Sequence, residues 1–586
     1  MYGCHGHYWR FDLSAGRGEL RPLPESVLRR YLGGVGLGAW LLYREAPPGV
    51  DPLAPEAPLV FAFSPLVGTP LTTSAKLAVV AKSPLTGLIS DGLSSSHFAI
   101  AGKRMGVDAI VLVGRCAEPS ELVDGALRPT ALWGRSAGEA QRALAERGRV
   151  AAIGVAGENG VRYASISNDG RHAGRGGLGA VMGAKRLKAL VLRGEVPTPL
   201  ADPARVHALA RDLSRRSLGP ATAKYRELGT VANLAAFNRI AALPSLNFQS
   251  GRFEQAAALS AEDLRPVRER ARASCASCTI GCEHIYGFGE GASTRIEYES
   301  LFALGPLCGV SDPEAVLAAS QRCDELGLDT ISAGGTIAFA MECGERGLLR
   351  GVPRFGDAEG LMALLDDIAH RRGLGDLLAE GSRRAALRIG GGAIAFAPQV
   401  KGLEIPGYEP RALQTMALGF AVGTRGADHN RSGAYEIDFS DRADRLHGDE
   451  GSARLALETE DRAALIDSLI LCKFLRGVFR DLYAEAAELL AAVTGWPVTP
   501  EELERLGRRV VTLRKAFNIR EGWKPEDDTL PERFLSEALP DGASAGASLP
   551  RERLGAMIRS YNLARGWTEE GYVPEALMRE LAIDAA

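Results

Sequence analysis

LADPARVHALARDL, residues 200–213, marks the point at which the apolar pattern of this chain changes. Before it, short apolar runs are cut by Gly, Pro and Asp at short intervals, as in APLVFAFSPL (57–66) and DAIVLVGR (108–115). After it, apolar residues recur at spacings of three and four, as in DPEAVLAASQRCDEL (312–326) and LYAEAAELLAAV (482–493). The short runs predict strands and the longer period predicts helices. We therefore expect an α+β protein in which a β-sheet region precedes a mainly helical one.

The composition is that of a soluble globular protein. The 586 residues, 46% hydrophobic and 24% charged, are too many for one core, so we expect two to four domains. The net charge of −3, without a basic stripe, predicts no nucleic-acid partner. No apolar run reaches the roughly 18 residues that span a bilayer, and MYGCHGHYWRFDL (1–13) lacks a signal-peptide pattern. We expect a cytoplasmic protein with no membrane span.

Three of the nine cysteines lie together in SCASCTIGCEH, at Cys275, Cys278 and Cys282. Iron–sulfur cubanes are held by four thiolates, often three that are close in sequence and one that is remote. A zinc site completed by His284 is the alternative, but one residue between the last two ligands is an unusually short spacing. The spacing favours an iron–sulfur cluster.

The fourth thiol must come from elsewhere in the chain. Cys472, in LILCKF, is the best candidate because we expect it inside an amphipathic helix of the helical region; Cys308 and Cys323 remain alternatives. Isolated cysteines are most often small buried apolar residues. We expect this of Cys4, Cys116, Cys308, Cys323 and Cys343.

A glycine-rich stretch, GRGGLGAVMGAKRLKAL (174–190), has the spacing of a dinucleotide-binding fingerprint. That fold needs a strand directly before the first glycine, and the polar ISNDGRHA (166–173) stands there instead. We therefore disfavour a Rossmann site. Two interpretations remain: the glycines let backbone N–H groups approach a phosphate at a helix start, or they form a tight turn for packing reasons.

Two short stretches have the outline of an elbow between helices. DELGLD (324–329) can end one helix at Gly327 and begin the next at Asp329, because Gly suits a left-handed C-terminal position and Asp an N-cap. DSLILC (467–472) repeats the outline with Ile470 in place of the glycine.

Together these motifs identify a family. The chain resembles the tungsten-containing aldehyde ferredoxin oxidoreductase family along nearly its whole length. The resemblance rests on the following stretches in this order: RYLGGVGLGAWLLY (30–43), KSPLTGLISD (82–91), AGRGGLGAVMGAKRLKAL (173–190), the cysteine cluster, EYESLFALGPLC (297–308), DELGLD, KGLEIPGYEPR (401–411), RGADH (425–429) and DSLILCKF.

The resemblance implies a bis-pterin cofactor whose dithiolenes hold one tungsten, with molybdenum possible, beside a [4Fe–4S] cluster, and a magnesium ion between the pterin phosphates. It implies a sheet domain covering the pterins at 1–200 and two helical domains at 201–404 and 405–586, with the cofactor at their interface. The implied cluster ligands are Cys275, Cys278, Cys282 and Cys472. The implied pterin and phosphate contacts are Lys76, Arg175, Gly176, Gly177, Gly179, Asp324, Gly327, Leu328, Asp329, Asp467, Leu471 and Cys472.

The resemblance also implies two catalytic residues. Glu299 aligns with the active-site glutamate of the family and would act as general base, and His429 would donate a hydrogen bond to the carbonyl oxygen. Glu297 is the alternative to Glu299, because in an extended segment the two would share a face. Tyr435 is a weaker candidate for the substrate pocket.

Three positions depart from the family pattern. Leu93 replaces an asparagine that helps to bind the magnesium ion, Ile470 replaces a glycine, and Lys76 replaces an arginine suited to phosphate. These changes indicate a divergent branch.

The resemblance implies oxidation of an aldehyde to a carboxylic acid, or the reverse, with electrons passing to ferredoxin or an iron–sulfur partner subunit. A homo-oligomer is compatible with it. The alternatives are reduction of an aromatic acyl-CoA ester and a non-catalytic electron-relay or structural subunit.

Overall fold

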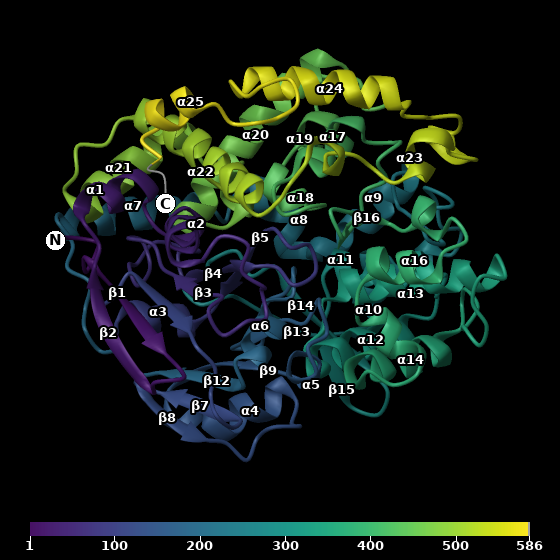
Figure 1. The fold of residues 1–586 in the computed structure, drawn as a ribbon. Helices are drawn as coiled ribbons and strands as arrows, with labels where there is room; N and C mark the ends of the chain where they lie inside the picture. The colour runs from purple at the N-terminus through teal and green to yellow at the C-terminus, as the bar shows by residue number, and fades with distance from the viewer. Residues whose placement is uncertain (584–586) are drawn as a thin grey trace.

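The computed structural model describes residues 1–583, and its first part is built on two six-stranded sheets (Figure 1). The first sheet contains, in spatial order, β2 (Arg17–Pro22), β1 (His7–Asp12), β6 (Ala109–Val113), β3 (Leu59–Ala62), β4 (Lys76–Lys82) and β5 (Ile89–Ser95). The second contains β11 (Arg171–Ala173), β10 (Ile166–Asn168), β9 (Arg149–Ile153), β12 (Leu187–Leu192), β7 (Ser120–Val123) and β8 (Ala126–Pro129). The helices of this part are α1 (Glu25–Tyr31), α2 (Gly34–Glu45), α3 (His97–Lys103), α4 (Ala137–Leu144), α5 (Val155–Glu158) and α6 (Leu178–Ala184).

Close backbone contacts hold these layers together. The central strands β3, β4 and β6 are buried nearly throughout, which explains their continuous apolar runs. The glycines of α2 let this helix lie directly on the sheet, since a Cβ on Gly38 would come within 2.5 Å of Val80 Cγ2. The two sheets meet where Gly92 of β5 faces Ala173 of β11, and a Cβ there would lie 3.0 Å from the Cβ of Ala173.

The rest of the described chain is mainly helical, as Figure 1 shows in teal to yellow. Its helices are α7 (Pro203–Arg216), α8 (Ala223–Leu228), α9 (Asn233–Arg239), α10 (Ala261–Arg268), α11 (Tyr298–Leu304), α12 (Pro313–Leu326), α13 (Thr330–Glu345), α14 (Ala358–His370), α15 (Leu374–Leu378), α16 (Ser382–Ile389), α17 (Gln414–Val422), α18 (His429–Ser432), α19 (Tyr435–Asp438), α20 (Glu450–Leu469), α21 (Leu482–Thr494), α22 (Pro500–Arg520), α23 (Glu532–Ser536), α24 (Arg551–Ala564) and α25 (Glu575–Glu580). The predicted α+β class is confirmed; the division of the helical part near residue 404 stays a prediction.

Two small sheets interrupt the helices, and the apolar pattern did not predict them. The first joins β13 (Glu269–Ala273), β14 (Glu283–Phe288) and β15 (Ala292–Arg295), and it frames the cysteine cluster. The second joins β16 (Gln399–Val400) and β17 (Leu403–Glu404) at the Gly/Pro-rich break.

Both elbows pack against glycines of the sheet region. In the first, Gly327 is left-handed (φ 79°) and ends α12, Asp329 caps α13, and the peptide of Gly154 lies 2.9 Å from where a Cβ of Gly327 would be. In the second, Ile470 adopts the same left-handed conformation (φ 63°) and its side chain packs over Gly34. The sequence outline of both elbows is therefore confirmed, and a β-branched residue occupies a conformation that usually requires glycine.

Two local expectations were wrong. The polar ISNDGRHA forms the hairpin of β10 and β11, so a strand does precede Gly174. It is an antiparallel edge strand, however, and the strand after α6 is not its neighbour, so no parallel dinucleotide-binding unit arises. Cys472 lies beyond the end of α20 rather than inside a helix, because the chain turns at Ile470.

None of the helices among residues 1–583 is long and apolar enough to cross a membrane.

Candidate active site

A cavity of about 530 Å³ brings together residues from distant parts of the helical region and one arginine from the sheet region. Its lining combines charged and polar side chains with several aromatic rings. It is lined by Arg175, Lys224, Tyr225, Thr230, Asn233, Ala236, Phe237, Glu297, Tyr298, Glu299, Ile331, Tyr408, Asp428, His429, Asn430, Tyr435, Phe439, Lys473, Phe474 and Arg476. Both predicted catalytic residues and Tyr435 are in this set.

Glu299 reaches the cavity from the first turn of α11. One carboxylate oxygen, Oε2, accepts the Gly407 N–H at 2.9 Å, whereas the other, Oε1, is buried without a hydrogen-bond partner among the described residues. Glu297 is the residue before the helix, and it pairs with Thr230 and, at 4.0 Å, with Arg171. The expected extended segment was wrong, because the helix begins between the two glutamates; both line the cavity, with different hydrogen-bond partners.

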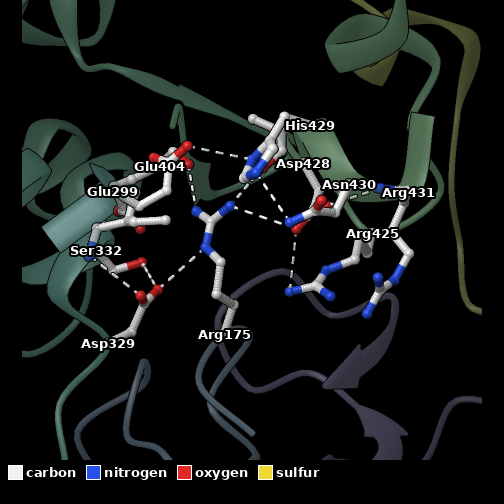
Figure 2. A network of polar contacts seen from close by, with 12 residues as sticks. Arg175, Glu299, Asp329, Ser332, Glu404, Arg425, Asp428, His429, Asn430 and Arg431 are labelled. Atoms are coloured by element: carbon white, nitrogen blue, oxygen red, sulfur yellow. Dashed lines mark hydrogen bonds and ion pairs between the residues drawn. The ribbon is translucent and has the colours of Figure 1, made fainter. Parts of the chain in front are cut away.

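His429 faces Glu299 across the cavity, at the start of α18 (Figure 2). Its ring stacks on Tyr408 with 4.8 Å between centroids, and its Nε2 lies 2.9 Å from the Asn430 side-chain nitrogen. With the Asn430 amide donating to Nε2, the neutral ring carries its proton on Nδ1. That atom lies 3.5 Å from Glu299 Oε1 and has no other partner.

Burial keeps both groups neutral at ordinary pH. It raises the pKa of Glu299 to about 8, against the lowering effect of the Gly407 N–H. It lowers the pKa of His429 to about 3, despite the opposing effect of Asp428. A carboxyl group with a pKa near the working pH can take up and release a proton, and opposite shifts within one pair are typical of acid–base sites.

Arg175 ties the first elbow to the loop that carries His429 (Figure 2). Its Nη1 donates to Ala427 O at 2.8 Å, and its Nε donates to Asp329 Oδ2 at 3.3 Å. Its remaining amino group bonds to Glu404 O. Arg175 thus spans the sheet region and both sides of the proposed boundary at 404.

A second buried polar cluster, which we call the Asp91 cage, lies next to the cavity. Asp91 of β5 pairs with Arg431, with Arg514 at 2.6 Å and with Arg425 at 3.7 Å. Burial alone would raise the pKa of Asp91, but the three guanidinium groups lower it to about 2. The cage connects β5 to two segments of the helical region that lie more than 300 positions further along the chain.

The glycine loop before α6 is explained mainly by packing. A Cβ on Gly176 would meet Ser90 Oγ at 1.9 Å, one on Gly177 would meet Arg162 O at 2.1 Å, and one on Gly179 would meet Ser165 O at 2.3 Å. Within this loop, Gly174 faces open space, with nothing within 4 Å of its Cβ position. The packing interpretation therefore accounts for the three predicted phosphate-binding glycines; a contact with phosphate stays a prediction.

The four proposed cluster cysteines belong to two segments that Thr73 joins. Thr73 donates its backbone N–H to Ser277 O at 2.7 Å and accepts the Cys472 N–H on Oγ1 at 3.2 Å. All four thiols are free and partly exposed, and Cys472 and Cys275 raise the pKa of Cys278 in addition to burial. The five isolated cysteines are all buried, as expected.

Lys76 begins β4 beside these thiols. Burial lowers its pKa, but Cys472, Cys275 and Asp467 have the larger combined effect and raise it. His284 has a different partner, since its Nδ1 lies 3.1 Å from Glu269. Across residues 1–583, no three His, Cys, Asp or Glu side chains converge on a point that could hold a single metal ion, and the iron–sulfur and zinc interpretations both stay predictions.

The other predicted cofactor contacts lie on the two elbows. Asp467 is buried, and its Oδ2 bonds to Arg431 and Lys473, each at 3.2 Å, while Oδ1 has no partner. Asp324 is partly exposed and pairs with His172 Nε2 at 3.1 Å. Leu328 bridges to Ala164 of the sheet region, and Leu471 is buried directly after the Ile470 turn. Only the second elbow thus has a buried unpartnered carboxylate oxygen.

Several neighbours of the site were not predicted. Asn430 directly follows the RGADH stretch, and Tyr408 lies inside KGLEIPGYEPR, so both could have been found by extending the motifs. Thr73 and Arg514 had no such signal, since their role depends on which distant segments meet, whereas Arg425 of the Asp91 cage lies inside RGADH.

Two family profiles match the chain. "Aldehyde ferredoxin oxidoreductase, N-terminal domain" matches residues 8–194, and "Aldehyde ferredoxin oxidoreductase, domains 2 & 3" matches residues 210–583. The chain belongs to the aldehyde ferredoxin oxidoreductase family. It is thus an oxidoreductase of that family, and the resemblance inferred from the motifs is confirmed.

Individual members of this family are similar over their full length. The tungsten-containing aldehyde ferredoxin oxidoreductase of Pyrococcus furiosus is 36% identical, covering 100% of this chain and 99% of that protein. The aliphatic sulfonate oxidoreductase, WOR-like subunit, of the same organism is 29% identical, with 100% and 98% coverage. Among solved structures, the active site complex BamBC of benzoyl coenzyme A reductase with 1,5-dienoyl-CoA matches with a TM-score of 0.85 and 26% identity, covering 99% of this chain and 97% of that one.

Proposed function

We propose that this protein oxidises an aldehyde to a carboxylic acid and passes the two electrons released, one at a time, to ferredoxin or an iron–sulfur partner subunit. The observation that carries the proposal is the facing pair in the cavity, where Glu299 Oε1 and His429 Nδ1 lie 3.5 Å apart, buried and without other partners. Buried polar atoms are normally satisfied, so an unpartnered pair indicates groups reserved for a ligand.

The two residues have complementary roles in this reaction. Water and the aldehyde together give the acid, two electrons and two protons. With a pKa of about 8, roughly a tenth of Glu299 is ionised at neutral pH and can accept a proton from the attacking water or the aldehyde hydrate. The neutral His429 can donate Nδ1–H to the carbonyl oxygen, where negative charge develops.

The residues of this chain fit the implied cofactors. Buried polar atoms without a partner among residues 1–583 lie at three places. They are Glu299 Oε1 and His429 Nδ1 in the cavity lining, Arg425 Nε and Arg514 Nε in the Asp91 cage, and Asp467 Oδ1 on the second elbow. A tungsten bis-pterin would supply the two-electron oxidation and a [4Fe–4S] cluster its one-electron outlet. The elbows, Arg175 and Lys76 would hold the pterins; Cys275, Cys278, Cys282 and Cys472 would hold the cluster. The side chain of Leu93 has no oxygen to offer a phosphate-bridging magnesium ion.

The aromatic walls favour a planar or apolar substrate. Phe237 and Phe439 stack with 5.3 Å between centroids, and Tyr225 and Phe474 stack at 4.0 Å on another wall. Such walls bind aromatic rings by offset stacking. They also suit a second candidate function, reduction of an aryl-CoA ester, which the similarity to a benzoyl coenzyme A reductase complex supports. Assaying aromatic aldehydes against aryl-CoA esters separates the two.

Substituting Glu299→Gln tests the proposal. The amide keeps the shape of the side chain but cannot take a proton, so kcat/KM for aldehyde-dependent dye reduction should fall by about 10²-fold or more. Glu458→Gln is the matched control and should leave the rate within about threefold, because that carboxylate is exposed outside the cavity and pairs with Arg442. Tungsten, molybdenum and iron contents are measured on each variant. Unchanged activity of a fully loaded Glu299→Gln enzyme would contradict the catalytic assignment and favour the electron-relay alternative.

A further inference from the structure

The strand that leads into the cysteine cluster forms an open sheet edge. β13 pairs with β14 on one side, and no strand pairs with its other side among residues 1–583. Arg270, Ala271 and Arg272 are exposed along it, and Cys275 follows three positions after Arg272. A molecule bound to this edge would therefore lie within about 10 Å of the Cys275 backbone, at roughly 3.3 Å per residue.

This edge is strongly basic, although the chain as a whole carries a net charge of −3. Four arginines occur in eight positions, at Arg265, Arg268, Arg270 and Arg272. The one carboxylate among them, Glu269, already bonds to Arg265 at 2.8 Å and to His284 at 3.1 Å. The acidic residues Glu262 and Asp263 lie at the opposite end of α10.

The arginines differ in what they do for the fold. Arg272 donates to Arg226 O and, at 3.3 Å, to Gly281 O, so it braces the cysteine loop. Arg268 lies 3.6 Å from Glu314. Arg270 has no carboxylate partner in the part of the chain that the structure describes and packs over Gly287. Its charge is thus available to an incoming molecule.

A shallow groove and an exposed apolar side chain complete this surface. The groove is lined by Arg265, Pro266, Glu269, Arg270, Ala271 and Arg272. Val267, on the adjoining turn of α10, is 70% exposed. An apolar contact beside an excess of positive charge is typical of transient protein interfaces, where complementary charge steers the encounter.

We propose that this arginine edge, residues 265–272, is the docking surface for an acidic one-electron iron–sulfur protein. The inference rests on the proposed function, because it takes the cluster at Cys275 as the electron outlet. Oxidation of one aldehyde releases two electrons and two protons, so two oxidised carrier molecules dock in turn and each leaves with one electron. The partner needs carboxylates to match the arginines, and β13 offers it unpaired backbone groups as well.

The test compares arginines on two edge strands. Arg270→Gln and Arg270→Glu change the proposed surface, and Arg128→Gln and Arg128→Glu are matched controls. Arg128 is also exposed, lies on the edge strand β8 and has no ion pair among residues 1–583. The probe is a purified acidic [4Fe–4S] ferredoxin, and its Kd for the holoenzyme is measured by calorimetry at about 50 mM and about 500 mM salt.

We expect Arg270→Gln to weaken ferredoxin binding about two- to fivefold at low salt, and Arg270→Glu to weaken it further. The difference from wild type should shrink at high salt, and the Arg128 variants should bind like wild type. Aldehyde-dependent reduction of a small dye should be equal in all variants.

Two results would overturn the docking surface: no measurable binding of ferredoxin to the wild type, or equal Kd values for the Arg270 and Arg128 variants. Failure of the proposed function appears separately, as absence of aldehyde-dependent dye reduction in the loaded wild type. The binding measurement does not depend on that activity.

Discussion

Two neighbouring buried clusters shift the pKa of a carboxyl group in opposite directions. In the Asp91 cage, three arginines surround one aspartate and lower its pKa to about 2. In the cavity, Glu299 is buried opposite a neutral histidine, and its pKa rises to about 8. Burial acts on both groups in the same direction, so the nearby cations decide the outcome. A carboxylate that forms ion pairs with several arginines stabilises the contact between distant segments. A buried carboxylate that forms no ion pair with an arginine can take up and release a proton.

The same contrast occurs between two adjacent residues, Asp428 and His429. Asp428 lies 3.5 Å from Arg425 and 3.6 Å from Arg175, and these cations hold its pKa well below the usual range despite burial. His429, the next residue, points into the cavity with its Nδ1 unpartnered. Two adjacent residues thus differ in role: Asp428 is held by arginines, whereas His429 presents an unpartnered Nδ1 to the cavity.

The largest expected effect is the loss of stability when Asp91 is removed from the Asp91 cage. Asp91→Ala leaves three buried guanidinium groups without their shared carboxylate, and the free energy of unfolding should fall by about 3–5 kcal/mol. Urea denaturation of the purified protein measures it. The control is Asp324→Ala, which removes a partly exposed pair with His172 and should cost less than about 1 kcal/mol. Equal losses in the two variants would mean that the cage is no more structural than a surface ion pair.

The cavity should respond in activity rather than in stability. His429→Gln keeps a polar side chain but moves the donor away from Glu299, so kcat/KM should fall by about 10²-fold, with a melting temperature close to that of wild type. His447→Gln, which alters an exposed histidine paired with Asp444, should change neither quantity. A large loss of stability in His429→Gln with unchanged kcat/KM would place His429 with the cage instead.

A smaller effect should appear in the pH dependence of stability. The Glu299 carboxyl ionises near 4.5 when unfolded and near 8 when folded, so the folded protein binds more protons between these values. Its contribution is fully present below pH 4.5 and is lost as the pH rises through 8. Relative to Glu299→Gln, wild type should therefore lose about 2 kcal/mol of unfolding free energy from pH 6 to pH 8. Parallel pH curves for the two proteins would show that Glu299 is not held protonated by the fold.

Some of the site followed from local sequence rules. DELGLD specified a left-handed Gly327 and a capping Asp329 because both preferences act within one turn of chain. DSLILC specified the same turn even with Ile470, since the buried side chain packing over Gly34 opposes the backbone cost of its conformation. The apolar periods separated the sheet region from the helices for the same local reason.

Other features could not be derived in this way. The start of α11 between Glu297 and Glu299, the hairpin before Gly174 and the end of α20 before Cys472 are boundaries, where local preferences differ little and packing decides. The small β13–β15 sheet was missed because two of its strands, β13 (ERARA) and β15 (ASTR), are short and polar.

By itself, the sequence determined the fold class, both elbows, the four cysteines proposed for a cluster and the pair Glu299 and His429 as candidates, because each is encoded by nearby residues or by the order of motifs. The tertiary structure alone decided which charges meet. Asp91 acquires its arginines from more than 300 positions away, whereas Arg175 lowers the pKa of Glu299 without forming an ion pair with it among residues 1–583. Protonation depends on distance and burial in three dimensions, and neither is a property of a single stretch of chain.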